Sequence, residues 1–187
     1  MDHLSQVAKD KYEEFKALLP PMKSRWQQHR ANWLPSPKNY FKFNYDGVVF
    51  AKVNKSDIGV VIRDNQGLVI ASLVQQLSQA YRAVEVKAMA ASRALKFGLE
   101  FGIHWPILEG DSEVVLKALE NEESGSATYE LLLKDASLFS SSFSTLSHSH
   151  TKRDDNKTTH SLARLAINFS EYTVWLVDVS SQSLNFV

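Results

Sequence analysis

Alternating hydrophobic and polar positions mark the first predicted strand of this chain. In the segment 40–53, YFKFNYDGVVFAKV, aromatic and polar residues alternate from Phe41 to Asp46, and this period of two is typical of a strand. Two more apolar segments, 57–64 and 68–76, flank the tetrapeptide DNQG, whose residue types favour a turn. We therefore predict three consecutive antiparallel strands, the second and third joined as a hairpin.

The period then changes to that of a helix. Segment 81–103 is rich in alanine and leucine, and its apolar residues recur at intervals of three and four, which predicts a long amphipathic helix. Its expected apolar face consists of Val84, Ala88, Ala91, Leu95 and Leu99. The remaining pattern predicts a strand at 105–111, helices at 112–120 (with Ser112 as N-cap) and 129–139, a strand at 143–150 and a helix at 156–166. The order of these elements indicates an α/β layer architecture.

One residue of the last helix does not follow its apolar pattern. Leu162, Leu165, Ala166 and Phe169 recur at the spacing of a buried face, which leaves His160 on another face in the first turn. The pattern leaves open whether His160 is solvated or faces a functional site.

The chain divides into two unequal parts. Apolar residues of 4–19 form one helical stripe that ends at Pro20-Pro21, and two more prolines follow at Pro35 and Pro37. We interpret residues 1–37 as a pendant helix and linker; alternatively, Trp26 and Trp33 pack this segment onto the main domain. The main domain is expected over residues 38–180, followed by a C-terminal tail at 181–187.

Composition narrows the function classes. The 187 residues suit one domain with an appendage, and the absence of cysteine excludes disulfides, thiolate zinc sites and cysteine nucleophiles. Lysine plus arginine equals aspartate plus glutamate, 21 of each, so any nucleic-acid contact must rest on a local basic patch. The acidic start is unlike a signal peptide, and no apolar run approaches the ~20 residues of a membrane span. We expect an intracellular protein of the nucleus or cytoplasm, with no membrane partner.

Three acidic residues stand at the ends of predicted elements. Asp46 precedes Gly47 near the end of the first strand, Glu85 lies in the first turns of the long helix, and Asp111 ends the fourth strand. Each has an ordinary structural explanation: a turn dipeptide, a complement to the helix dipole, and a capping pair. Together at one sheet edge, however, three carboxylates would repel one another unless they shared a cation, and oxygen ligands favour Mg²⁺ or Mn²⁺.

Six segments in order resemble the type 1 ribonuclease H domain, in the plant form found in non-LTR retrotransposon polyproteins and their domesticated copies. The resemblance covers about residues 33–180. The segments are FKFNYDG, IGVVIRDNQGLVIAS, AVEVKAMAASRALKFGLEFGI, LEGDSEVVLKAL, HTKRDDNKTTHSLARLA and YTVWLVDV.

This resemblance implies both a fold and an activity. The fold would be a ribonuclease H-like α/β fold, with a mixed five-stranded sheet (three antiparallel strands, then parallel strands) flanked by helices. The activity would be endonucleolytic cleavage of the RNA strand of RNA/DNA hybrids, with two Mg²⁺ or Mn²⁺ ions per site. No organic cofactor is implied, and we expect a monomer.

The resemblance also assigns roles to the acids. Asp46, Glu85 and Asp111 match the family's first three catalytic, metal-binding acids, whereas the fourth acid, four residues after Asn156, is replaced by His160. Asp46 would bridge both ions, Glu85 and Asp111 would hold the leaving-group ion, and His160 would help to hold the water-side ion. A neutral imidazole adds no negative charge and suits softer ions, so we expect a weakened magnesium site with a relative preference for manganese.

The segment before His160 contains further candidates. His150 matches a flexible histidine that the family uses in proton handling or product release; the alternative is a histidine that merely ends a strand. The residues that we expect to contact nucleic acid are Lys152, Arg153, Asn156 and Lys157. Asp154 and Asp155 interrupt the basic cluster, so a solvated charged loop is the competing interpretation.

Two functions of different classes remain open. The chain is either an active hybrid ribonuclease or a catalytically impaired, retrotransposon-derived domain that binds nucleic acid or protein. Another member of the wider superfamily, such as an exonuclease or a transposase-type integrase, fits the order and spacing of the motifs less well.

Overall fold

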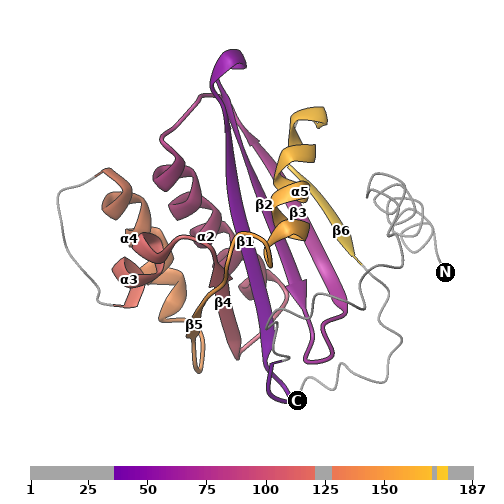
Figure 1. Ribbon diagram of the computed structural model, residues 1–187. Helices are drawn as coiled ribbons and strands as arrows, with labels where there is room; N and C mark the ends of the chain where they lie inside the picture. Colours follow the sequence, from indigo (N-terminus) through magenta and orange to yellow (C-terminus); the bar gives the residue numbers. More distant parts are fainter. Residues whose placement is uncertain (1–35, 121–127, 170–171, 177–187) are drawn as a thin grey trace.

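A six-stranded mixed sheet forms the centre of the protein (Figure 1). The computed structural model describes residues 36–120, 128–169 and 172–176. Almost all of the predicted pendant segment 1–37, and the whole predicted tail 181–187, lie outside these residues. The strands are β1 (Phe41–Phe50), β2 (Lys55–Arg63), β3 (Val69–Leu77), β4 (Pro106–Gly110), β5 (Ser147–His150) and β6 (Thr173–Leu176), in the spatial order β5-β4-β1-β2-β3-β6.

The four helices predicted between residues 81 and 166 form as expected. They are α2 (Ala83–Glu100), α3 (Glu113–Glu120), α4 (Thr128–Ser140) and α5 (Lys157–Leu165), with short 3₁₀ turns η2 (Ala51–Val53) and η3 (Ala166–Asn168). Ser112 directly precedes α3, and its carbonyl accepts the N–H of Leu116, as the N-cap position requires. No helix among the described residues is long and apolar enough to cross a membrane.

The sheet has one more strand than the five that we predicted. β1, β2 and β3 are antiparallel, and β1, β4 and β5 are parallel to one another, as expected. The additional strand, β6, pairs antiparallel with the outer edge of β3. The prediction of five strands was wrong because a four-residue strand is too short to show a period, and its place depends on pairing with a strand about 100 residues earlier in the chain.

Helices cover both faces of the sheet. α2 packs on β1, β2 and β4, with α4 against α2, whereas α5 lies across β1, β2 and β3 on the other side (Figure 1). The contact of α5 depends on Gly59 of β2. A Cβ at this position would lie 2.7 Å from the backbone nitrogen of Ala163, so only glycine lets the helix backbone rest on the strand.

Two hydrophobic clusters hold these layers together. The larger cluster fills the space between the sheet, α2 and α4, and it contains the predicted face of α2: Ala88, Ala91 and Leu95 are fully buried, and Val84 and Leu99 pack against them. The smaller cluster, which we call the α5 cluster, lies under α5 and consists of Val61, Val74, Leu162, Ala166 and Trp175, with Phe169 and Val69 against it. Of the predicted apolar face of α5, Leu162 and Ala166 are buried, whereas Leu165 and Phe169 are partly buried.

Candidate active site

The candidate site lies where two parallel strands separate. β1 and β4 are paired from Phe41 opposite Pro106 to Asn44 opposite Glu109. Two residues beyond this last pair, each segment carries an aspartate: Asp111 directly follows β4, whereas Asp46 lies within β1, which continues to Phe50 and is longer than the prediction of a strand-end aspartate implied. The carboxyl ends of parallel strands meet at one sheet edge, and openings between them are frequent ligand sites in α/β proteins. The fold thus places two predicted catalytic acids at one opening.

Asp46 is held from two sides. Its side chain is 3% exposed; Oδ1 accepts the N–H of Gly47 at 2.8 Å, and Oδ2 lies 2.7 Å from Nδ1 of His160. Because an ionised carboxylate only accepts hydrogen bonds, the Nδ1–H of His160 donates to it. His160 therefore faces the site rather than bulk solvent.

The start of α5 is fastened beside Asp46. Asn156, the residue just before the helix, is 3% exposed, and its amide nitrogen donates to the carbonyl of Tyr45 at 3.0 Å. The carbonyl of Asn156 in turn accepts the N–H of His160 at 3.0 Å. This pair of bonds fixes the first turn of α5, and with it the imidazole, next to the strand residue that carries the acid.

A lysine that the sequence analysis did not select reaches both aspartates. Nζ of Lys87, on α2, lies 2.5 Å from Oδ1 of Asp111 and 3.6 Å from Oδ1 of Asp46. The helix can approach this closely because Gly47 has no side chain. A Cβ on Gly47 would lie only 2.5 Å from Cγ1 of Val86. The sequence contains a local signal that could have identified Lys87 as a candidate site residue. Lys87 and Glu85 are the only charged residues in the first half of α2.

Glu85, the third predicted acid, is engaged by Arg82. Its Oε2 accepts the backbone N–H of Arg82 at 2.9 Å, which is half of a capping box, and its Oε1 accepts the guanidinium of the same residue at 2.8 Å. The hydrogen bond from the Arg82 side chain is the main reason why the pKa of Glu85 is lowered. Within the described part of the chain, no hydrogen bond or ion pair joins Glu85 to Asp46 or Asp111.

The two aspartates affect the pKa of the neighbouring Tyr45. It is fully buried behind them, with its ring packed so closely on Gly110 that a Cβ there would lie 2.4 Å from the ring. Burial raises the pKa of Tyr45, and the negative charges of Asp111 and Asp46 raise it further. The phenol therefore stays neutral, and of the described residues only Lys87 forms an ion pair with both aspartates.

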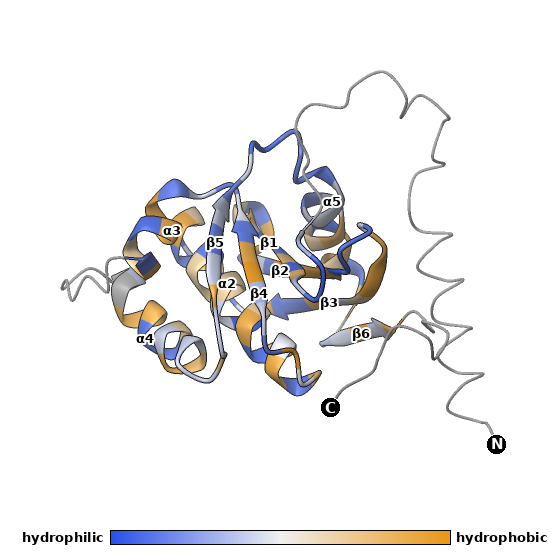
Figure 2. Cartoon of the chain, turned by 90° about the horizontal axis from the view of Figure 1, so that it is seen from below, coloured by the Kyte–Doolittle hydropathy of each residue, from blue (hydrophilic) through white to orange (hydrophobic). Residues whose placement is uncertain are grey.

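The remaining predicted residues lie around the site without touching the acids. His150 is exposed at the end of β5, opposite Gly110, and it has no hydrogen bond or ion pair with Asp46, Glu85 or Asp111 in the described structure. Lys152 and Arg153 are exposed on the hydrophilic connection between β5 and α5 (Figure 2). Lys157 forms an exposed ion pair with Asp154 at 3.3 Å. Contact of Lys152, Arg153, Asn156 and Lys157 with nucleic acid stays a prediction, and so does the catalytic role of His150.

Comparison with known proteins places the chain in a family. The model of the family described as reverse transcriptase-like matches residues 44–166, which include Asp46, Glu85, Asp111 and His160. The chain belongs to the reverse transcriptase-like family. No curated protein matches this reverse transcriptase-like chain.

Solved structures show the fold of the reverse transcriptase-like domain. It is similar to ribonuclease H1 from the archaeon Halobacterium salinarum, with a TM-score of 0.64 and 21% identity over 69% of this chain and 98% of that one. The N-terminal ribonuclease H domain of a Mycobacterium tuberculosis protein gives 0.63 and 18% over 69% and 94%. LC11-RNase H1 in complex with an RNA/DNA hybrid gives 0.61 and 19% over 68% and 96%. The predicted ribonuclease H-like α/β fold is confirmed.

The donor atoms suit a divalent cation in chemical type. Two carboxylates, with an imidazole beside one of them, are the kinds of ligand that Mg²⁺ and Mn²⁺ accept. As they stand, no three His, Asp or Glu side chains of the described residues form a ligand group for a metal ion. The ammonium group of Lys87 lies instead between the two aspartates.

Proposed function

We propose that this domain cleaves the RNA strand of RNA/DNA hybrids with the help of Mg²⁺ or Mn²⁺, two ions per site. The observation that carries the proposal is the meeting of Asp46, Asp111 and His160 where β1 and β4 separate. Similarity in fold to three ribonuclease H structures, one of them in complex with an RNA/DNA hybrid, supports the substrate class.

The acidic residues and His160 would bind the metal ions. Asp46, Glu85, Asp111 and His160 would hold the ions, and such ions would activate a water as nucleophile and stabilise the charge of the leaving oxygen. His160 keeps one nitrogen on Asp46, so that its other nitrogen, Nε2, remains for a ligand or a proton.

Residues outside the metal-binding set would bind the substrate. Lys152, Arg153, Asn156 and Lys157 would contact phosphates of the hybrid, and His150 would assist proton transfer or product release. Because phosphate contacts release counterions, binding is expected to weaken steeply with salt. Recognition of RNA would rest on 2′-hydroxyls and helix shape rather than on base sequence.

A second function is favoured by a different observation. Arg82 binds Glu85, and Lys87 binds Asp111 and Asp46, so each predicted acid is engaged by a basic side chain of the protein itself. This arrangement suits a catalytically impaired domain that binds nucleic acid or another protein.

Cleavage of a labelled RNA/DNA hybrid separates the two functions. We expect the protein to cleave faster with manganese than with magnesium, and Asp46→Asn to lower the rate by roughly 100-fold or more. His160→Asp should raise the rate in magnesium, because it restores a carboxylate at that position. Asp135→Asn, on the exposed side of α4, is the matched control and should cleave like the parent protein. Hybrid binding without cleavage, in both the parent and His160→Asp, would support the binding function instead.

Finer features of the proposal stay predictions. They are the plant non-LTR retrotransposon type, the monomeric state, the absence of an organic cofactor, and a location in the nucleus or cytoplasm.

A further inference from the structure

The carboxylates of Asp46 and Asp111 lie close together at the opening between β1 and β4, where a positive charge would stabilise them. Their side chains are 3% and 8% exposed, so water screens their mutual repulsion poorly. Such a buried carboxylate pair is stable only if one of the two groups binds a proton or if the two share a cation.

Lys87 supplies this positive charge from α2, which packs on the face of the sheet opposite to α5. Its Nζ contacts Oδ1 of both aspartates, at 2.5 Å and 3.6 Å, and its side chain is only 19% exposed. Of the other basic groups nearby, Arg82 binds Glu85, and His160 binds Asp46 only through Oδ2, so neither joins the two aspartates. The backbone fixes Lys87 in this place, because α2 touches β1 at Gly47.

An ammonium group and a divalent ion cannot share this position. A magnesium ion that bridged the two aspartates would need their oxygens at about 2.0–2.1 Å, which is the space that Nζ of Lys87 fills. Two cations at such a separation would also repel each other strongly in a poorly hydrated opening.

We propose that Lys87 is a built-in cation of this site, which neutralises Asp46 and Asp111 and must be displaced before a divalent ion can bridge them. The inference concerns the site of the proposed function, and it predicts how that site takes up metal. Lys87 thus acts as a positioning residue that sets the metal affinity of the two carboxylates.

Metal binding by the full chain tests this proposal without any measurement of cleavage. We would titrate Mn²⁺ into the parent protein, Lys87→Met and Lys96→Met by calorimetry, and record the melting temperature of each with EDTA and with Mn²⁺. Lys96 is the matched control, because it is an exposed lysine of the same helix. We expect Lys87→Met to bind Mn²⁺ at least about 10-fold more tightly than the parent, and Lys96→Met to bind like the parent.

The melting temperature is a second measure of the competition between Lys87 and Mn²⁺ for the two carboxylates. Without metal, Lys87→Met should melt at a lower temperature than the parent, because the two carboxylates then face each other without the ammonium group. Mn²⁺ should restore its melting temperature more than it raises that of the parent. A variant that folds only when Mn²⁺ is present would also support the proposal.

Other results would overturn it. Equal or weaker Mn²⁺ affinity in Lys87→Met would show that the lysine does not compete with metal, and so would a variant that stays unfolded at saturating Mn²⁺. Tighter Mn²⁺ binding without hybrid cleavage would leave this inference standing and count against the proposed function, so the two can fail separately.

Discussion

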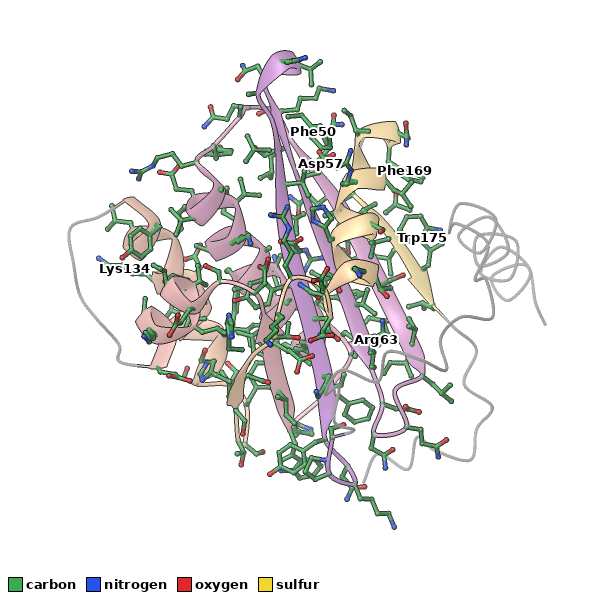
Figure 3. The ribbon with its side chains drawn as sticks, in the orientation of Figure 1. Phe50, Asp57, Arg63, Lys134, Phe169 and Trp175 are labelled. Atoms are coloured by element: carbon green, nitrogen blue, oxygen red, sulfur yellow. The ribbon has the colours of Figure 1, made fainter. Side chains whose placement is uncertain are left out.

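One buried carboxylate outside the site accepts no hydrogen bond from the described residues. Asp57 on β2, labelled in Figure 3, is fully buried opposite Val48 of β1, and neither of its oxygens has a hydrogen-bond partner among the described residues. Burial raises the pKa of Asp57 to about 6, although the positive charge of Lys55 opposes the shift. A carboxyl group whose folded pKa is raised binds its proton more tightly in the folded state, so folding stability decreases as the pH rises from about 4 to about 6.

We predict that Asp57→Asn stabilises the protein at neutral pH. The amide keeps the shape of the side chain but has no charge to bury, so the gain at pH 7.5 should be about 1–3 kcal/mol and should nearly vanish at pH 4. Urea unfolding of the variant and the parent at the two pH values measures this difference. Asp135→Asn, at an exposed position, should show no such pH-dependent gain.

At the scale of elements, a buried polar network joins three strands. Glu109 of β4 accepts hydrogen bonds from Lys42 and Asn44 of β1, both at 2.8 Å, and from the hydroxyl of Ser149 on β5 at 3.1 Å. Lys42, Asn44 and Glu109 are all at most 6% exposed. The polar side of the first predicted strand is therefore a second interior face rather than a solvated one. This network ties β1 to β4 directly below the point where they separate toward Asp46 and Asp111.

We predict that Glu109→Gln destabilises the fold by about 2–4 kcal/mol, because it removes the negative charge that faces buried Lys42. Thermal or urea unfolding followed by circular dichroism measures the loss. The matched control is Glu113→Gln, which removes the carboxylate of an exposed ion pair with Lys117 and should change stability little. Equal effects of the two substitutions would contradict a special role for the network.

At the scale of the whole molecule, the site depends on the α5 cluster, on the far side of the sheet from the larger core. Trp175 of β6 is 2% exposed, and its ring meets that of Phe169 edge to face at 5.3 Å (Figure 3). Leu162 and Ala166 bring α5 onto the same cluster. β6 lies beyond the part of the chain that matches the family model, yet it supports the helix that carries His160.

We predict that Trp175→Ala costs about 3–5 kcal/mol of folding stability, as is usual for truncation of a buried large aromatic side chain. Loss of this support should also loosen α5, so amide exchange in α5 should accelerate more than in α2. Hydrogen exchange read by mass spectrometry compares the two helices in one experiment. Trp105→Ala, at a tryptophan that is 40% exposed, should cost much less; a similar cost would contradict the proposed support.

Much of the architecture was predictable because it is encoded locally. Strand and helix periods located β1 to β3, α2 and α5, and the turn-forming DNQG segment predicted the hairpin. The candidate site was half predictable: Asp111 follows from its place after a strand, Asp46 from the Asp-Gly dipeptide in the first strand, and His160 only from the resemblance, which places the family's fourth acid four residues after Asn156. What these patterns could not supply was the partner of each charged group, because those partners are distant along the chain.

The sequence alone determined the order of the first five strands and the helices from residue 81 onward, as well as the absence of cysteine chemistry; the set of acids with His160 in place of the fourth is what the resemblance implies. Only the tertiary structure decided that β6 completes the sheet, that Glu109 and Asp57 are buried, and that Lys87 lies between Asp46 and Asp111. Helical period could show only that Lys87 lies off the apolar face of α2. Where its ammonium group ends depends on the close contact of α2 with Gly47 and on the separation of β1 from β4, and both arise from packing between distant segments.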